Sequence, residues 1–169
     1  MIASAATRWV WIPARVAPDP ATLGKVIDDL RGIRIAIGST AHGIEGFRRS
    51  HLDALTTQRL LARLHSTQRI ASFDTVQLVS LVTENPDRAG QFIKDTLGEL
   101  ETASPEIRTA VLAFVTEQCN ASRAATRLYT HRNTLLRRLS RAEQLLPRPL
   151  EKNSVNVAVA LDVLRWRGG

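Results

Sequence analysis

The sequence predicts an α+β protein that is mainly α-helical, in which a short β-α-β-α-β region precedes an all-α helix-turn-helix bundle. Two observations predict this class. Short strand-like segments bounded by Gly and Pro lie before residue 72, whereas the remainder has apolar residues at helical spacing. Nearly all of the net positive charge also falls on one predicted helix pair near the C-terminus. We therefore expect an α/β region over residues 1–72 and a helical domain over residues 73–169.

The composition is typical of a globular protein with its own core. The chain has 169 residues, 44% of them hydrophobic, and a formal net charge of +7. Its single cysteine, Cys119, excludes an internal disulfide and is expected to be a small core residue at a helix end. No apolar run approaches the roughly 20 residues of a membrane span, and residues 1–20 lack the apolar segment of a signal peptide. We therefore predict a cytoplasmic protein that does not contact the membrane.

Strand and helix signals alternate in the first 72 residues. We expect strands at residues 8–16, 34–38 and 69–71 and helices at residues 21–30 and 47–65. The first strand carries Trp9 and Trp11 and is ended by Pro13. Gly43 and Gly46 are expected in the loop before the second helix.

Proline start signals divide the rest of the chain into helices. Asn85-Pro86 and Ser104-Pro105 each place a capping residue before a first-turn proline. Further helices are predicted at residues 73–82, 86–97, 105–119 and 153–166. The last of them is apolar enough to be largely buried, against the helix-turn-helix or against a second subunit.

The rest of the chain is organised around residues 120–146, which predict two helices joined by a tight turn. Ala124 and Ala125 share one face of the first helix, where small residues let another helix cross closely. Thr130 is the expected N-cap of the second helix. The second helix then carries one apolar stripe, made of Leu135, Leu139, Ala142 and Leu146. This pattern predicts a helix-turn-helix over residues 122–146, with a recognition helix beginning near His131.

The charge distribution indicates a polyanionic partner. Residues 120–149 contain seven arginines and one acid, Glu143, and so carry +6. Residues 1–118 balance 13 Lys and Arg against 13 Asp and Glu. Positive charge concentrated on one supersecondary unit is typical of nucleic-acid binding, because a merely solvated helix face mixes both signs. A soluble arginine-rich helix without a DNA role is the alternative.

Residue types along this unit predict separate roles on double-stranded DNA. Arginine can bond guanine O6 and N7 together, and the first turn of a recognition helix faces the base edges. The expected base-reading residues are His131, Arg132, Asn133 and Arg137. The expected backbone contacts are Arg123, Arg127, Thr134, Arg138 and Arg141. Thr134 has a second interpretation as a helix-interior residue, and Ser122 is either a phosphate contact or an N-cap.

The same residues carry a family resemblance. The run A-A-x-x-L-x-x-H-R-N-T-L-x-x-R-L-x-R, from Ala124 to Arg141, resembles the C-terminal domain of PucR-type (also CdaR- or sugar-diacid-type) bacterial transcriptional regulators. It is also similar, more loosely, to the DNA-binding end of factor-for-inversion-stimulation-like proteins. Arg137 stands where the PucR-type pattern often has Tyr, which leaves the contact at this position open. The resemblance implies a transcription regulator, with an effector sensed through a missing or upstream domain.

The N-terminal region resembles the later half of the degenerate cyclase-like (GGDEF-like) domain that precedes the helix-turn-helix in many PucR-type regulators. The resemblance rests on Gly38, Gly46 and the run Arg48-Arg49-Ser50-His51. The acidic GGDEF signature does not occur in the sequence, so nucleotide cyclisation is not expected. The opening strand and helix of such a domain are expected to be missing, either because the chain is a fragment or because the protein is a shortened member.

Enzymatic, metal and cofactor chemistry is not predicted. The sequence contains no H-E-x-x-H, C-x-x-C, G-x-S-x-G, P-loop or G-x-G-x-x-G motif, and its four histidines lack metal-ligand spacing. The sequence predicts a DNA-binding regulator that forms a homodimer, since one helix-turn-helix makes few base contacts. A protein–protein module and a small-ligand-sensing module without DNA contact are the alternatives. Operator, effector and the sign of regulation are not encoded in any recognisable pattern.

Overall fold

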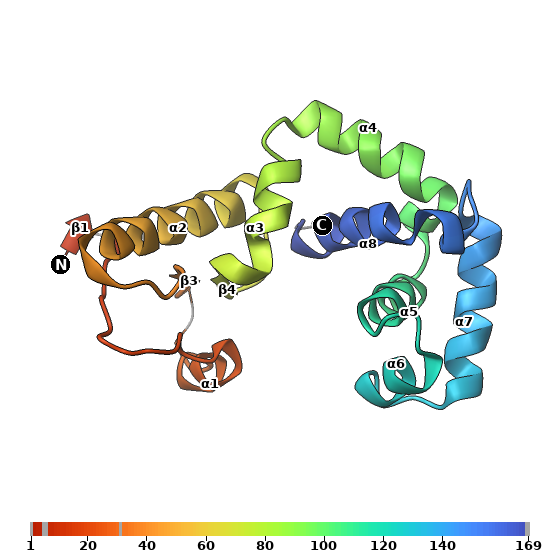
Figure 1. The fold of residues 1–169 in the computed structure, drawn as a ribbon, viewed down its shortest axis with the longest axis horizontal. Coiled ribbons are helices and arrows are strands. Elements are labelled where there is room, and N and C mark those ends of the chain that lie inside the picture. Colours follow the sequence, from red (N-terminus) through yellow and green to blue (C-terminus); the bar gives the residue numbers. More distant parts are fainter. Residues whose placement is uncertain (1, 5–6, 31, 168–169) are drawn as a thin grey trace. The chain divides into compact units, whose positions relative to one another are not determined.

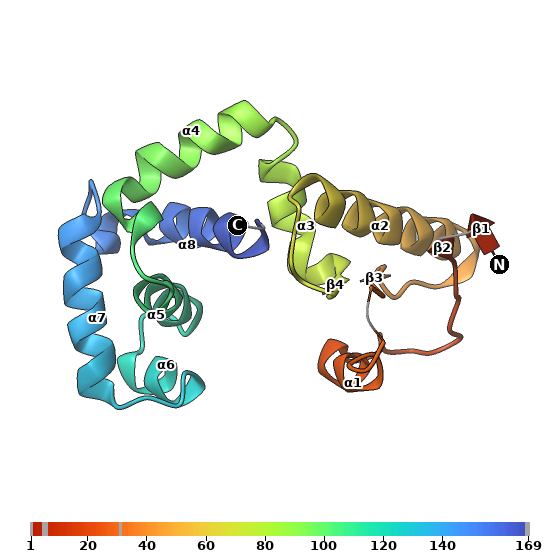
Figure 2. The same ribbon diagram turned by 180° about the vertical axis from the view of Figure 1, so that it is seen from behind.

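The computed structural model describes residues 2–4, 7–30 and 32–167, and its fold is mainly α, with a small amount of β-structure, as predicted (Figure 1). The chain divides into two compact units. The α/β unit comprises Met1–Arg59 and Gln68–Thr75, and the helical unit comprises Leu60–Thr67 and Val76–Gly169. Figure 2 shows the same elements from behind. No helix within the described ranges is long and apolar enough to cross a membrane.

The α/β unit contains two small sheets and the helices that accompany them. Its elements are β1 (Ile2–Ser4), β2 (Thr7–Arg8), α1 (Pro20–Val26), β3 (Ile35–Ile37), most of α2 (Gly43–Arg63) and β4 (Ile70–Ser72). Strands β1 and β2 pair antiparallel. Strands β3 and β4 pair parallel, with Ile35 opposite Ile70 and Ile37 opposite Ser72. The strands predicted at residues 34–38 and 69–71 are therefore confirmed, and the structure adds that they pair parallel.

The strand predicted at residues 8–16 is wrong, because within that segment only Arg8 belongs to a strand. The tryptophans that follow pack against α2 instead. The ring of Trp9 lies 4.4 Å from that of His51, and the ring of Trp11 stacks 5.3 Å from that of Phe47. Aromatic contact with a helix thus replaces strand pairing in a segment that contains a proline.

Helix α1 is shorter than predicted. It begins as expected, since the Asp19 carboxylate accepts hydrogen bonds from the backbone N–H groups of Ala21 and Thr22. It ends at Val26 rather than at residue 30. The Arg69 guanidinium donates to the carbonyl oxygens of Ile27 and Leu30, and so satisfies acceptors that lie beyond the helix end.

The placement of Gly43 and Gly46 in a loop is also wrong, because α2 begins at Gly43 and includes both. A Cβ at Gly46 would lie 2.8 Å from the carbonyl carbon of Ala41, so the chain folds closely back onto the first turn of this helix. At Gly38, a Cβ would lie 2.0 Å from the carbonyl oxygen of Ser50. The end of β3 therefore touches the backbone of α2 directly, which only glycine permits.

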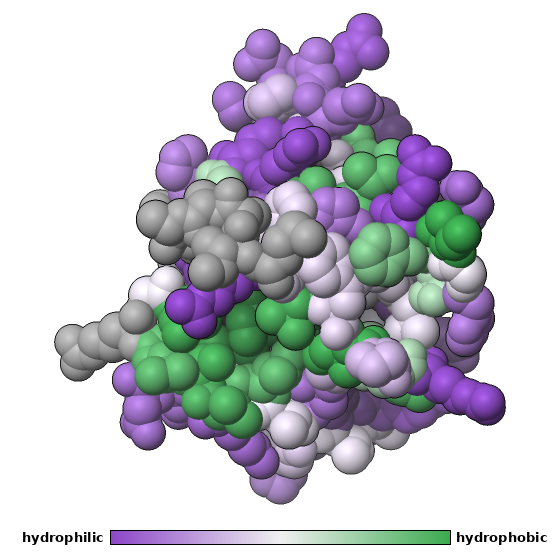
Figure 3. All heavy atoms as spheres, turned by 90° about the vertical axis from the view of Figure 1, so that its left-hand side faces the viewer, coloured by the Kyte–Doolittle hydropathy of each residue, from purple (hydrophilic) through white to green (hydrophobic). Residues whose placement is uncertain are grey.

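The α/β unit leaves several large apolar side chains at its surface. The most exposed within the described ranges are Val10, Val16, Val26, Ile44 and Leu52, each at least 60% exposed. In the view of Figure 3, apolar side chains gather at the surface. Apolar surface of this kind is typical of regions that contact another chain.

The helical unit is built from helices joined by short connections. Its elements are most of α3 (Phe73–Val82), α4 (Pro86–Leu97), the 3₁₀ turn η1 (Gly98–Thr102), α5 (Pro105–Thr116), α6 (Ala121–Arg127), α7 (Arg132–Leu145) and α8 (Leu150–Trp166). Helices α3 and α4 have the predicted bounds, and the Asn85 side chain caps α4 by accepting from the Arg88 N–H. Helix α5 packs against both α7 and α8, and α6 packs against α5 and α7 (Figure 1).

Helix α5 ends at Thr116, three residues before the predicted end. The N–H of Cys119 bonds back to the Phe114 carbonyl at 2.9 Å, while Gln118 and Cys119 adopt left-handed backbone conformations with φ of 55° and 57°. This closure turns the Cys119 side chain outward. The expectation that Cys119 is a core residue is therefore wrong, because its thiol is exposed.

The final helix also differs from its prediction at the N-terminal end. Helix α8 begins at Leu150 rather than at residue 153, and Asn153 interrupts it with a non-helical backbone. The Glu143 carboxylate of α7 accepts from the Leu150 N–H, with both oxygens at 3.2 Å, so α7 caps the helix that follows it. Most of the apolar face is buried as predicted, although Val155 is exposed.

Candidate nucleic-acid interface

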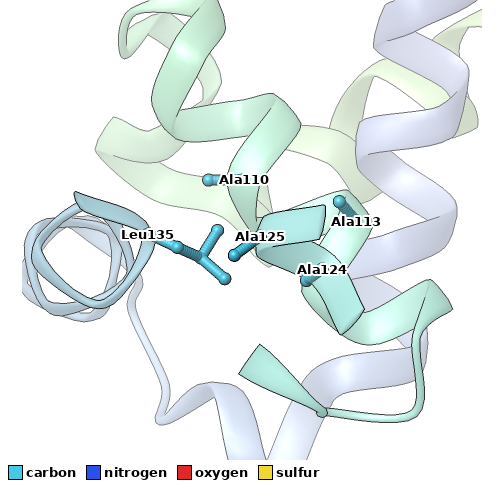
Figure 4. Packing of buried hydrophobic residues seen from close by; sticks show 5 residues of the cluster. All are labelled: Ala110, Ala113, Ala124, Ala125 and Leu135. Carbon is cyan, nitrogen blue, oxygen red and sulfur yellow. The ribbon is translucent and has the colours of Figure 1, made fainter. Parts of the chain in front are cut away.

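A small apolar cluster fixes the angle between the two helices of the helix-turn-helix. Its buried members are Ala110 and Ala113 of α5, Ala124 and Ala125 of α6, and Leu135 of α7 (Figure 4). Four of the five side chains are single methyl groups, so the backbones of α5 and α6 approach closely, as the alanine pair predicts. Leu135 is fully buried against them. This one side chain anchors the first turn of α7.

The turn between α6 and α7 is closed by backbone hydrogen bonds. The Asn120 side chain caps α6 by accepting from the N–H groups of Ser122 and Arg123, so the N-cap interpretation of Ser122 is wrong. At the other end, the Thr130 N–H bonds to the Ala125 carbonyl at 3.0 Å, while Tyr129 adopts a left-handed conformation with φ of 49°. This is the Schellman arrangement that terminates helices.

The N-cap of α7 is His131, so the prediction of Thr130 as the N-cap is wrong. His131 has an extended backbone, and its carbonyl accepts from the Leu135 N–H at 3.1 Å. The backbone N–H of Thr130 instead bonds to the Ala125 carbonyl at the end of α6. The His131 side chain makes no capping hydrogen bond, so the first backbone N–H groups of α7 are without a side-chain acceptor among the described residues.

The first turn of α7 is exposed. His131, Arg132 and Asn133 all lie at the surface, as does Arg137 one turn further on. Within the described part of the chain, none of these four side chains has a hydrogen bond or an ion pair. Thr134 is half-buried. The structure therefore leaves the four predicted base-reading side chains exposed at the N-terminal part of α7 and free of partners within the described ranges.

The helix-turn-helix and the helices beside it match a known protein family. Residues 108–164 match the family model of the PucR C-terminal helix-turn-helix domain. The helical unit carries a PucR-type helix-turn-helix domain. The match runs from α5 into α8 and covers the whole of α6 and α7. A domain of this family indicates a DNA-binding regulator.

The α/β unit has a match of its own. Residues 2–60 match the family model of a GGDEF-like domain, which precedes the helix-turn-helix domain along the chain. This order confirms the resemblance to a PucR-type regulator with an N-terminal GGDEF-like part. No curated protein matches the chain.

The arginines of α6 in this PucR-type domain are engaged by an acid of α5's C-terminal cap. Glu117 lies 2.9 Å from the Nη1 atom of Arg127 and 3.7 Å from the Nε atom of Arg123. Arg123 also donates to the Glu117 carbonyl at 2.9 Å and to the Gln118 side chain at 3.1 Å. Both guanidinium groups remain about half exposed. They therefore orient α6 and still present donors to solvent.

The later arginines of α7 have weaker partners. Arg141 donates to the neutral Gln144 side chain at 2.9 Å. Arg138 is half-buried and faces the start of α5, where the pKa of the Glu106 carboxyl is lowered by the Ser104 hydroxyl, by the Glu106 backbone N–H and, to a smaller degree, by the Arg138 charge. No carboxylate within the described residues lies at salt-bridge distance from either arginine.

Two surface residues beside this site were missed in the sequence analysis. Leu136 is 39% exposed although its neighbour Leu135 is buried, and Tyr129 in the turn is 99% exposed. Leu136 could have been found, because it lies off the apolar stripe of α7. Tyr129 could not, since a residue in a turn has no helical periodicity to place it. Among the described residues, no group of His, Cys, Asp or Glu side chains could hold a metal ion.

Proposed function

We propose that this protein is a sequence-specific transcription regulator that inserts the N-terminal turn of α7 into the major groove of double-stranded DNA. The observation that carries the proposal is the free surface of that turn, formed by side chains without partners in the described chain and held by buried Leu135. In this role Arg132 bonds the O6 and N7 atoms of a guanine, and Asn133 bonds an adenine edge. His131 and Arg137 flank these two readers.

The DNA backbone contacts surround the base-reading turn. We assign them to Arg138 and Arg141 on α7, to Thr134 near its start, and to Arg123 and Arg127 on α6. The α6 pair keeps this role because a guanidinium has five N–H donors, of which Glu117 engages only part. Glu117 then acts as an orienting group that holds two cations at the edge of the duplex.

The domain roles follow from the same reasoning. Residues 73–169 serve as the DNA-binding domain, and residues 1–72 serve as a partial GGDEF-like region for dimerisation or signalling. The exposed apolar side chains of the α/β unit support a homodimer. Two-fold symmetry would place two recognition helices about one helical turn of DNA apart, or a multiple of it. A small-molecule effector is a further partner that we propose for this regulator.

Selection of bound sequences from random duplex DNA by the purified chain tests this function. We expect enrichment of a motif with two related half-sites. Binding to the selected duplex should weaken with salt, with a slope of log K against log[salt] of roughly −0.9 for each phosphate contact. Light scattering of the free chain, which should report a dimer, tests the assembly separately. Absence of both enrichment and salt dependence would favour the alternative of a protein–protein or ligand-sensing module.

A further inference from the structure

We propose that Tyr129 is a DNA-backbone contact, whose phenol hydroxyl donates a hydrogen bond to a phosphate oxygen beside the bases read by α7. This proposal rests on the proposed function and adds to it a residue outside the arginine cluster. Tyr129 lies in the turn between α6 and α7, two residues before His131, and its side chain is 99% exposed. Tyrosine is among the side chains that bond phosphates and so fix the register of a protein on DNA.

The backbone at Tyr129 indicates that the side chain has a use. Its φ of 49° is left-handed, a conformation in which a bulky residue is unfavourable and glycine is preferred. Three helices of the described chain end with the same closure. The bonds are Ser66 N–H to Leu61 at 3.0 Å, Cys119 N–H to Phe114 at 2.9 Å and Thr130 N–H to Ala125 at 3.0 Å. None of the three uses glycine at the left-handed position that precedes the donor.

The other two closures use their left-handed side chains within the fold. Gln118, at the end of α5, accepts a hydrogen bond from Arg123. His65, at the end of α2, lines a cavity together with Arg63 and Thr83. Tyr129 has neither kind of contact within the described residues, since its ring is exposed on all sides. Within the described chain, no contact of the Tyr129 side chain offsets the cost of its left-handed backbone. We therefore infer that the side chain contacts an external partner.

The surroundings favour a phosphate as that partner. Arg132 and Asn133 begin the exposed turn only three residues later, so a duplex read by them passes beside the Tyr129 hydroxyl. A phenol is a neutral donor and replaces no counterion. Its contribution is thus a hydrogen bond to a charged acceptor, which is stronger than one between neutral groups.

Two substitutions in the full chain test the assignment. Tyr129→Phe keeps the ring and removes only the hydroxyl; we expect about tenfold weaker binding to the selected duplex and to a scrambled duplex alike, the size of one charge-assisted hydrogen bond. The salt slope should not change. Tyr129→Gly should raise the thermal unfolding midpoint, because glycine suits the left-handed backbone, while weakening DNA binding at least as much. A Tyr129→Gly variant that is more stable but binds DNA more weakly is therefore the result that the phosphate contact predicts.

His65→Gly is the matched control, because His65 has the same backbone conformation at a helix end outside the DNA-binding residues. It should leave DNA binding unchanged, which would show that glycine at a helix end does not by itself weaken binding. Parent-like binding by Tyr129→Phe would overturn the proposal, and so would a loss confined to the selected duplex, which would make Tyr129 a base contact. Failure of the parent chain to bind any duplex would instead overturn the proposed function.

Discussion

The two helices of the helix-turn-helix carry arginines in very different surroundings. On α6, Arg123 and Arg127 converge on one carboxylate, that of Glu117. On α7, Arg132 and Arg137 have no partner among the described residues, and Arg141 has only a neutral amide. Equal charges in the sequence thus become two kinds of group in the fold. One kind helps to set the angle between α5 and α6, and the other is available to a ligand.

This difference teaches how to interpret an arginine-rich helix pair. A net charge of +6 over residues 120–149 indicates a polyanionic partner, but it does not say which charges meet that partner. The pairing pattern in the structure ranks them, because a cation already engaged by an acid has less of its charge left for phosphate. The following predictions address this ranking, first through the packing that positions both helices and then through the arginines themselves.

The largest effect is expected at the packing contact between α7 and α6. Leu135→Ala should lower the free energy of unfolding by about 2–5 kcal/mol, because it leaves a cavity against four alanines that cannot expand to fill it. The neighbouring Leu136→Ala is the control and should change the free energy of unfolding by less than about 0.5 kcal/mol, since Leu136 is partly exposed. Urea denaturation followed by far-UV circular dichroism measures both. Similar losses in the two variants would mean that Leu135 does not anchor α7.

A smaller effect separates the two groups of arginines. Arg127→Gln and Arg141→Gln each remove one positive charge from the helix pair. Arg127→Gln should lower the free energy of unfolding by about 0.2–1 kcal/mol, because it breaks the pair with Glu117. Arg141→Gln should leave stability unchanged and should flatten the slope of log K against log[salt] by roughly 0.9. Arg127→Gln should flatten it by less, because Glu117 already offsets part of the Arg127 charge.

Denaturation curves and DNA-binding isotherms at several salt concentrations measure this pair of variants side by side. Equal changes in stability and in slope would remove the distinction between α6 and α7. A larger flattening of the salt slope by Arg127→Gln than by Arg141→Gln would reverse the distinction. It would make α6 the main source of DNA-backbone contacts.

Much of the fold could be predicted from local signals. At Asn85-Pro86 and at Ser104-Pro105 the predicted helix begins where the structure has it. Predictions failed where distant groups decide the outcome. Helix α1 ends early, and the Arg69 guanidinium, about 40 residues further along the chain, binds the carbonyls of Ile27 and Leu30 beyond its end. The tryptophan segment is not a strand because α2 supplies aromatic partners.

The candidate site shows the same division. Helical spacing predicted which side chains are exposed at the start of α7, because exposure follows from the position of the apolar stripe. This spacing did not predict that Glu117 binds two of the arginines, since that contact depends on how the C-terminal cap of α5 turns. Nor did it identify Tyr129, whose exposure follows from a helix closure and not from a repeating pattern.

The central claim is that the free first turn of α7 reads bases, and binding of Arg132→Ala to the selected and scrambled duplexes at fixed salt tests it most directly. Loss of a bidentate guanine contact should cost about 1–3 kcal/mol on the selected duplex and relax preference at one base pair. Binding to the scrambled duplex should change much less. Arg132→Lys keeps the charge without the planar fork, and should resemble Ala on the selected duplex and the parent on the scrambled one. Equal losses on both duplexes would contradict base reading and make Arg132 a phosphate contact.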